Sequence, residues 1–84
     1  MKEILRQQSF TLEDGMEVIV TYSLIKSNGN ECRPYGIRAE MNTAGKCLDA
    51  AQANTRFATK EETAAVAKIL ANNTVTPMTL NYVI

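Results

Sequence analysis

Two long β-prone runs joined by the dipeptide Asn28-Gly29 constrain the fold of this 84-residue chain more than any other feature. The runs are MEVIVTYSLIKS and NECRPYGIRAEM, and both are rich in the β-branched and aromatic residues that favour strands. Asn and Gly tolerate the positive φ angles that a two-residue type I′ turn requires at both central positions. The sequence therefore predicts a β-hairpin over residues 16–41.

The pairing of this hairpin follows from the turn. If Ser27 pairs with Asn30, Tyr22 lies opposite Tyr35, and alternate residues share a face. One face then carries an apolar stripe, formed by Met16, Val18, Val20, Tyr22, Leu24, Tyr35, Ile37, Ala39 and Met41. The other face is mixed and places Glu17 opposite Glu40. Pro34 falls opposite Ser23 and cannot donate a ladder hydrogen bond, so we expect the hairpin to be bulged or unpaired there.

The segments on either side extend the sheet. Residues 2–12 alternate in the strand period, with Ile4, Phe10 and Leu12 on one side. A three-residue loop over 13–15, with Gly15 as a left-handed bulge, would set Phe10 beside Val18. After a turn over 42–46, residues 47–53 suit either a helix or a fourth strand. Sheet context favours the strand, with Cys47 returning beside Met41.

The last third of the chain carries helix signals. Thr59 and Glu62 form a capping box, and Asn72-Asn73 supplies a C-terminal stop. Between them, an apolar stripe of Val66, Ile69 and Leu70, with Ala65 close to it, is expected to face the sheet. Thr76-Pro77 predicts a second, short helix that docks Leu80 and Val83.

These elements predict one α+β domain over residues 1–84. It is a three- or four-stranded antiparallel β-meander, with one main helix packed across the apolar face and a short C-terminal helix. A chain of this length buries only about 60% of its unfolded surface, so the core is small.

Composition excludes several classes of function. Nine basic and nine acidic residues give zero formal net charge without a cluster of either sign. Nucleic acid is therefore an unlikely partner, as is an anionic membrane. The chain has no histidine and only Cys32 and Cys47, which the strand pairing keeps apart, so we expect free thiols, no metal site and no cofactor. It shows no signal peptide or membrane span, which predicts a cytoplasmic location.

Two surfaces are candidates for binding, and we expect no catalytic residue and no enzymatic activity. One helix covers one sheet face, so the mixed face would stay open, with Ile19, Ile25 and Arg38 around a notch at Gly36. This open face predicts a protein-interaction or regulatory module. Such a module would bind another protein, or a second copy of itself as a homodimer, through this face or an edge strand. The alternative is a surface that binds a small ligand or single-stranded nucleic acid, formed by Arg6, Tyr22, Arg33 and Tyr35. Glu17 and Glu40 offer the one carboxylate pair for catalysis, and a solvated pair is the favoured interpretation.

Four motifs carry a resemblance to known sequences. They are S-F-T-L-E-D-G from Ser9, V-x-V-T-Y-S-L-I from Val18, Y-G-I-R from Tyr35 and N-x-V-T-P-x-x-L-x-x-V-I from Asn73. The chain resembles a family of small uncharacterised bacterial proteins, mostly from Gram-positive anaerobes. The resemblance implies a bacterial cytoplasmic protein and assigns no functional residue. Residues 47–57 depart most from the family pattern.

Overall fold

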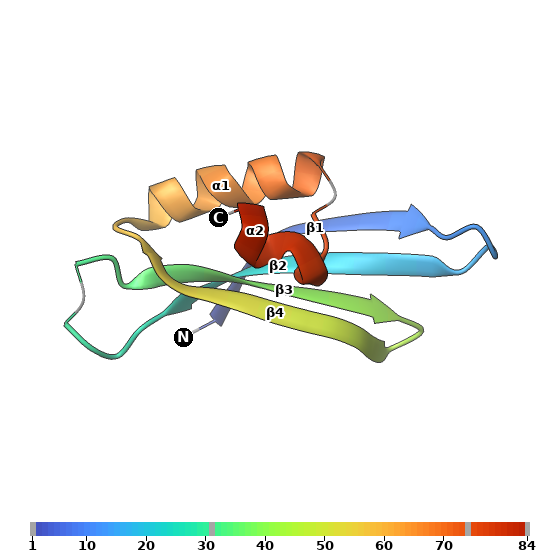
Figure 1. Cartoon of the computed structure of the whole chain (residues 1–84), viewed down its shortest axis with the longest axis horizontal. Helices are drawn as coiled ribbons and strands as arrows, with labels where there is room; N and C mark the ends of the chain where they lie inside the picture. Colours follow the sequence, from blue (N-terminus) through green and yellow to red (C-terminus); the bar gives the residue numbers. More distant parts are fainter. Residues whose placement is uncertain (1, 31, 74, 84) are drawn as a thin grey trace.

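The computed structural model describes residues 2–30, 32–73 and 75–83 of the chain. Four strands come first, β1 (Lys2–Thr11), β2 (Glu17–Lys26), β3 (Tyr35–Thr43) and β4 (Lys46–Phe57), and two helices follow, α1 (Lys60–Asn72) and α2 (Pro77–Val83). The strands form one antiparallel sheet in the order β1-β2-β3-β4, and both helices lie on the same side of it (Figure 1). The predicted α+β meander is confirmed in its four-stranded form, and residues 47–53 are strand.

The hairpin between β1 and β2 has the predicted bulged turn. Gly15 has a φ angle of 86° and donates its N–H to the carbonyl of Leu12 at 2.9 Å. The N–H of Leu12 in turn reaches the carbonyl of Met16 at 2.8 Å, and Phe10 pairs with Val18. Glycine adopts this left-handed conformation without the steric cost of a side chain, which is why the turn closes here.

The hairpin between β2 and β3 differs from the prediction. Asn28-Gly29 does not close a two-residue turn, because β2 ends at Lys26 and β3 begins at Tyr35. Pro34 lies in the connection rather than the ladder, and its carbonyl accepts the N–H of Ser27 at 2.8 Å. Tyr22 consequently pairs with Ala39 instead of Tyr35. The pairing has moved by an even number of residues, so the apolar stripe stays on one face although every predicted cross-strand pair is wrong.

A type I′ turn does occur, between β3 and β4. Ala44 and Gly45 have φ angles of 47° and 76°, and they connect the paired residues Thr43 and Lys46. Cys47 therefore lies opposite Asn42, one residue from the predicted Met41. Two positive φ angles in succession match the twist of the flanking strands, and this turn sets the register of β4 against β3.

Helix α1 begins as the capping box predicts, because the Thr59 hydroxyl accepts the N–H of Glu62 at 3.1 Å. Asn73 caps the C-terminal end. The buried stripe is rotated from the predicted one and consists of Thr63, Ala67, Leu70 and Ala71. Ile69 is 58% exposed, so its predicted place in the core is wrong. Apart from Leu70 the buried residues are small, and the larger Ile69 lies outside this stripe.

The core lies between the sheet and the helices. Its largest fully buried side chains include Tyr22, Leu24, Ile37, Leu70 and Leu80. Leu80 confirms the predicted docking of α2, while the side chain of Val83 lies outside what the structure describes. On β1 a bulge between Ile4 and Arg6 brings Leu5 against the core and leaves Ile4 61% exposed, which corrects the predicted role of Ile4.

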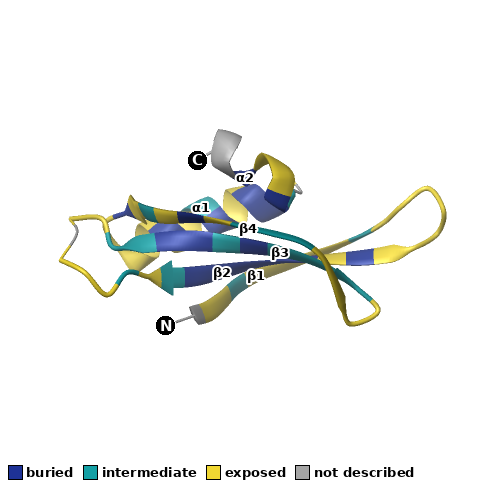
Figure 2. Cartoon of the chain, turned by 60° about the horizontal axis from the view of Figure 1, so that its bottom comes forward, coloured by how far each residue is buried: buried dark blue, intermediate teal, exposed yellow. Residues whose placement is uncertain are grey.

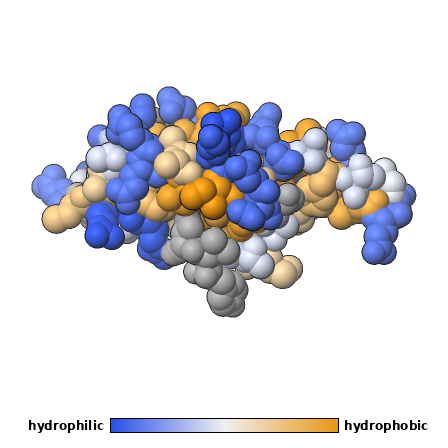
Figure 3. Space-filling model, turned by 90° about the horizontal axis from the view of Figure 1, so that it is seen from above, coloured by the Kyte–Doolittle hydropathy of each residue, from blue (hydrophilic) through white to orange (hydrophobic). Residues whose placement is uncertain are grey.

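The molecule is elongated, with extents of 45 × 21 × 20 Å. Helix α1 covers one half of the sheet and α2 its middle, and the hairpin turns at the opposite end extend beyond both helices (Figure 1). At that end Leu12, Met16 and Leu48 are each about 40% exposed. The helix side also exposes Ile69 and Met78, and Figure 3 shows hydrophobic side chains among hydrophilic ones on that side.

Candidate functional site

The side of the sheet opposite the helices is the candidate binding surface, and we call it the outer face (Figure 2). Neither helix covers it, as the mixed face of the sequence analysis predicts. Its residues, taken from the strand pairings, include Ile4, Gln7, Ile19, Thr21, Ser23, Ile25, Gly36, Arg38, Glu40, Ala50 and Gln52.

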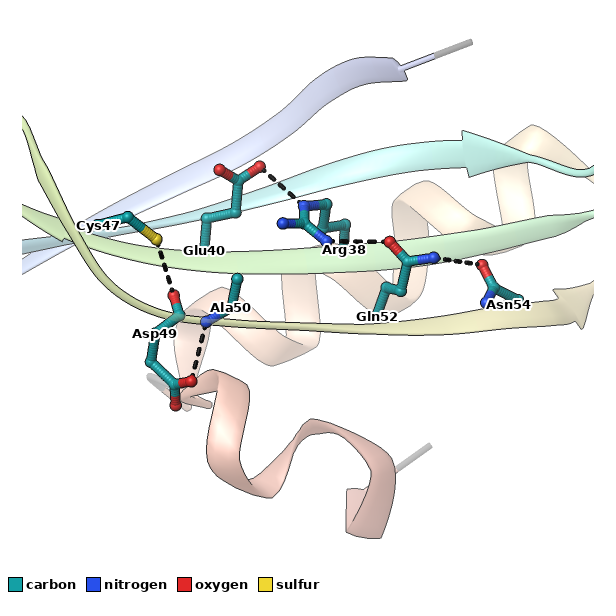
Figure 4. A network of polar contacts seen from close by, with 7 residues as sticks. All are labelled: Arg38, Glu40, Cys47, Asp49, Ala50, Gln52 and Asn54. Atoms are coloured by element: carbon teal, nitrogen blue, oxygen red, sulfur yellow. Dashed lines mark hydrogen bonds and ion pairs between the residues drawn. The ribbon is translucent and has the colours of Figure 1, made fainter.

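A chain of polar contacts crosses the outer face over β3 and β4 (Figure 4). Arg38 Nε lies 3.2 Å from Glu40 Oε1, and Arg38 Nη1 donates to Gln52 Oε1 at 3.0 Å. Gln52 Nε2 donates in turn to Asn54 Oδ1 at 3.0 Å. The Arg38 side chain is 33% exposed and that of Glu40 is 21% exposed. The guanidinium is thus held in place by a carboxylate and an amide while part of it still meets solvent.

The strand pairings explain this arrangement. Arg38 pairs with Gln52 across β3 and β4, and Glu40 lies two residues further along β3 on the same face. Sequence reasoning found Arg38 and missed both of its partners, because it paired Glu40 with Glu17 and left β4 undecided. Glu40 pairs with Thr21 instead, and Glu17 pairs with Thr11, so the predicted carboxylate pair does not form. Alternation along β4 would have found Gln52 once that segment was taken as a strand.

Two isoleucines lie on β2, the strand next to the one that carries Arg38 and Glu40. Ile19 is 40% exposed and Ile25 is half-buried, and they lie on β2 on either side of Thr21 and Ser23. Gly36 pairs with Ile25 rather than with Thr21, and it is buried. A Cβ built on Gly36 would overlap the carbonyl oxygen of Ala53. The predicted notch at Gly36 is therefore filled by the backbone of β4 and offers no room to a partner's side chain.

The middle of the outer face contains two small hydroxyl residues. Thr21 is 9% exposed, and its Oγ1 accepts from Gln7 Nε2 at 3.2 Å. Ser23 is fully buried, and its hydroxyl has no hydrogen-bond partner in the part of the chain that the structure describes. A buried hydroxyl without a partner destabilises the fold, because it has lost its hydrogen bonds to water.

The alternative surface is not assembled. Tyr22 is fully buried on the helix side, where its hydroxyl donates to the carbonyl of Val75 at 2.6 Å. Tyr35 is half-buried against the core, with the Lys26 ammonium 5.7 Å from its ring centroid. Arg6 is exposed opposite Tyr22 on β1, and Arg33 is exposed in the connection between β2 and β3. The predicted aromatic pair does not exist, and the Tyr22 ring cannot stack with a ligand while the core is intact.

The fold shifts the pKa of Tyr22. Burial of Tyr22 raises the pKa of its phenol above the ordinary value, because the phenolate would lose its hydration in the core. This tyrosine lies on the helix side of the sheet, so its titration belongs to the stability of the fold rather than to the outer face.

Other kinds of site are not found among the described residues. They contain no group of three or more potential metal-ligating side chains and no surface pocket. No helix in the described ranges is long and apolar enough to cross a membrane. Cys32 and Cys47 are exposed free thiols, one in the β2–β3 connection and the other beside the β3–β4 turn.

Comparison with known proteins places the chain in a family. Residues 1–84 match the model of a family of unknown function, DUF6514, and the chain belongs to that family. No curated protein matches the sequence, and no solved structure matches the fold.

Proposed function

We propose that this member of a family of unknown function is a small, non-catalytic protein-interaction module that binds its partner through the outer face of its sheet. One observation carries the proposal. Arg38 is fixed by Glu40 and Gln52 in the middle of a sheet face that neither α1 nor α2 covers, and Ile19 and Ile25 lie on the same face of the neighbouring strand β2.

An anchored arginine on a face that also carries apolar side chains suits protein recognition. Arginine is enriched in the energetically dominant centres of protein interfaces, where neighbouring apolar groups exclude water. The two contacts of the guanidinium already restrict its rotamers, so less conformational entropy is lost when a partner binds. Ile19 and Ile25 supply apolar contact area on the same face. The polar contacts of Arg38 with Glu40 and Gln52 would fix the orientation of the bound partner.

The edges of the sheet are less suited to binding. The edge strands are β1 and β4. A bulge at Leu5 interrupts the pairing of β1, and a bulge at Leu48 interrupts the pairing of β4. A second irregularity in β4 places Thr55 at a φ angle of 51°. Bulged and twisted edges resist pairing with a further strand. The sequence suggested association through the mixed face or through an edge strand, and these irregular edges favour the face.

We place this activity in the bacterial cytoplasm. The two exposed thiols support the location, because unpaired surface cysteines persist in a reducing compartment. The bacterial source is an expectation from the sequence resemblance.

The experiment uses the tagged protein as bait in an extract of the cells that produce it. We expect the wild type to retain at least one protein, a copy of the chain itself included, that Ile19→Glu loses. The matched control is Ile69→Glu, which makes the same change at an isoleucine that is more exposed, 58% against 40%, and lies on the helix side. Identical sets of retained proteins for all three baits would refute the proposal.

A further inference from the structure

We propose that the partner of the outer face is a second copy of this chain, packed face to face about a two-fold axis that crosses the strands at the Tyr22–Ala39 pair. The inference rests on the proposed function, and it names the partner. The side chains of Tyr22 and Ala39 point to the helix side, so the axis passes between the outer-face rows on either side of that pair.

The axis brings opposite charges together. A two-fold rotation about a line across the strands places each strand over its own copy, running in the opposite direction. Arg38 and Glu40 lie one residue on either side of Ala39. Arg38 therefore faces Glu40 of the partner subunit, and Glu40 faces the partner's Arg38. The intrachain ion pair of 3.2 Å becomes part of a network of four charges.

The same axis brings the isoleucines together. On β2, Ile19 and Ile25 lie three residues on either side of Tyr22. Ile19 of one copy therefore faces Ile25 of the partner subunit. Gly36, which pairs with Ile25, presents no side chain that would hold the two faces apart. On β2 and β3 the outer face is thus self-complementary in both charge and apolar contact.

Charge also excludes the neighbouring alignments. An axis at Arg38 would set the guanidinium against its own copy, and an axis at Glu40 would do the same to the carboxylate. Like charges in direct contact are strongly unfavourable in an interface, so they select the axis between them. The formal net charge of the chain is zero, so no overall repulsion opposes the approach of two copies.

The area is sufficient for a dissociable dimer. Four strands spaced at about 4.8 Å, with a nine-residue β3 rising about 3.3 Å per residue, give a face of roughly 19 × 30 Å. The planar area is roughly 550 Å², and the uneven surface of the side chains makes the accessible area larger. The result lies near the lower end of the range for stable interfaces, which average about 800 Å² per partner. We therefore expect a dimer that dissociates on dilution.

Charge reversal tests the inference directly. Arg38→Glu and Glu40→Arg are each expected to weaken the dimer at least about 100-fold, because each sets like charges face to face. An equimolar mixture of the two variants is expected to dimerise again, since every contact across the axis is then between opposite charges. Neither chain in the mixture regains its own ion pair, so the rescue reports contact between chains.

The measurement is the solution mass by light scattering over a concentration series, with far-UV circular dichroism to show that each variant is folded. A dimeric wild type, monomeric single variants and a dimeric mixture would support the inference. The double variant Arg38→Glu/Glu40→Arg, expected to be dimeric, serves if a single variant does not fold. A monomeric wild type, or single variants that stay dimeric alone, would overturn it. In the monomeric case, a different protein captured by the wild type and lost by Ile19→Glu would leave the proposed function standing.

Discussion

Tyr22→Phe removes one hydroxyl from the core and is expected to destabilise the protein measurably. The Tyr22 hydroxyl donates to the carbonyl of Val75 at 2.6 Å and lies 3.4 Å from that of Leu70. Val75 lies between the two helices, and its N–H donates to the Leu70 carbonyl at 3.0 Å. The tyrosine therefore joins the middle of the sheet to the connection between α1 and α2.

The magnitude follows from what the substitution leaves behind. A hydrogen bond contributes about 0.5–1.5 kcal/mol net, and the partly buried Val75 carbonyl would also lose a partner, so we expect a loss of about 1–2 kcal/mol. For a domain of this size that lowers the Tm by roughly 5–15 °C. The assay is thermal unfolding followed by circular dichroism. Tyr35→Phe is the matched control, since the Tyr35 hydroxyl has no hydrogen bond within the described part of the chain, and its Tm should stay within about 2 °C. Equal shifts in both variants would refute the reasoning.

The same residue makes stability depend on pH. Burial holds the pKa of Tyr22 in the folded state above its value in the unfolded chain. The contribution is therefore complete below pH 10 and is lost as the pH rises through the folded-state pKa, because the unfolded chain releases the proton first. The wild type should lose stability more steeply above pH 10 than Tyr22→Phe, in which this group is absent. Parallel losses in urea titrations of the two proteins would contradict the assignment.

Three further substitutions test single features of the sheet. Ser23→Ala removes the unpartnered buried hydroxyl and should raise the free energy of unfolding by about 1 kcal/mol, and a loss of stability in urea titration would show that the hydroxyl is satisfied. Gly36→Ala places a Cβ against the Ala53 carbonyl and should cost about 2 kcal/mol or more, seen as a lower Tm; an unchanged Tm would mean that β4 lies further away. Ala44→Asn suits the left-handed turn position better and should raise the free energy of unfolding by about 0.5–1 kcal/mol; the same denaturation midpoint for both proteins would contradict this.

The architecture could be predicted from the sequence because its signals are local and periodic. The alternation along β2 and β3 defines the apolar face, and Gly15 and Thr59 mark one turn and one helix start, as the structure confirms. The β2–β3 register could not be predicted from the Asn28-Gly29 dipeptide. The local turn preference was overridden by tertiary packing, because the observed pairing of Tyr22 with Ala39 leaves Tyr22 buried in the core.

The candidate site was harder to predict than the fold. Ile19, Ile25 and Arg38 were placed correctly on the outer face, because an even change in register does not exchange the two faces. The partners of Arg38 depend on the β3–β4 register, which is set by the Ala44-Gly45 turn and the Leu48 bulge. Neither has a strong sequence signature. The burial of Tyr22 depends on the position of α2, which strand patterns do not contain.

The order of the strands in the sheet also has a consequence for how the chain folds. Because β1-β2-β3-β4 follows the order of the sequence, every strand pairs with its neighbour along the chain, and each hairpin can form before the rest is in place. The packing of α1 against β1 joins segments that are far apart in the sequence, so it closes a longer loop and costs more chain entropy than any of the hairpins. Substitutions under α1, such as Leu70→Ala, should therefore mainly accelerate unfolding, whereas destabilising changes in the β3–β4 turn should slow folding.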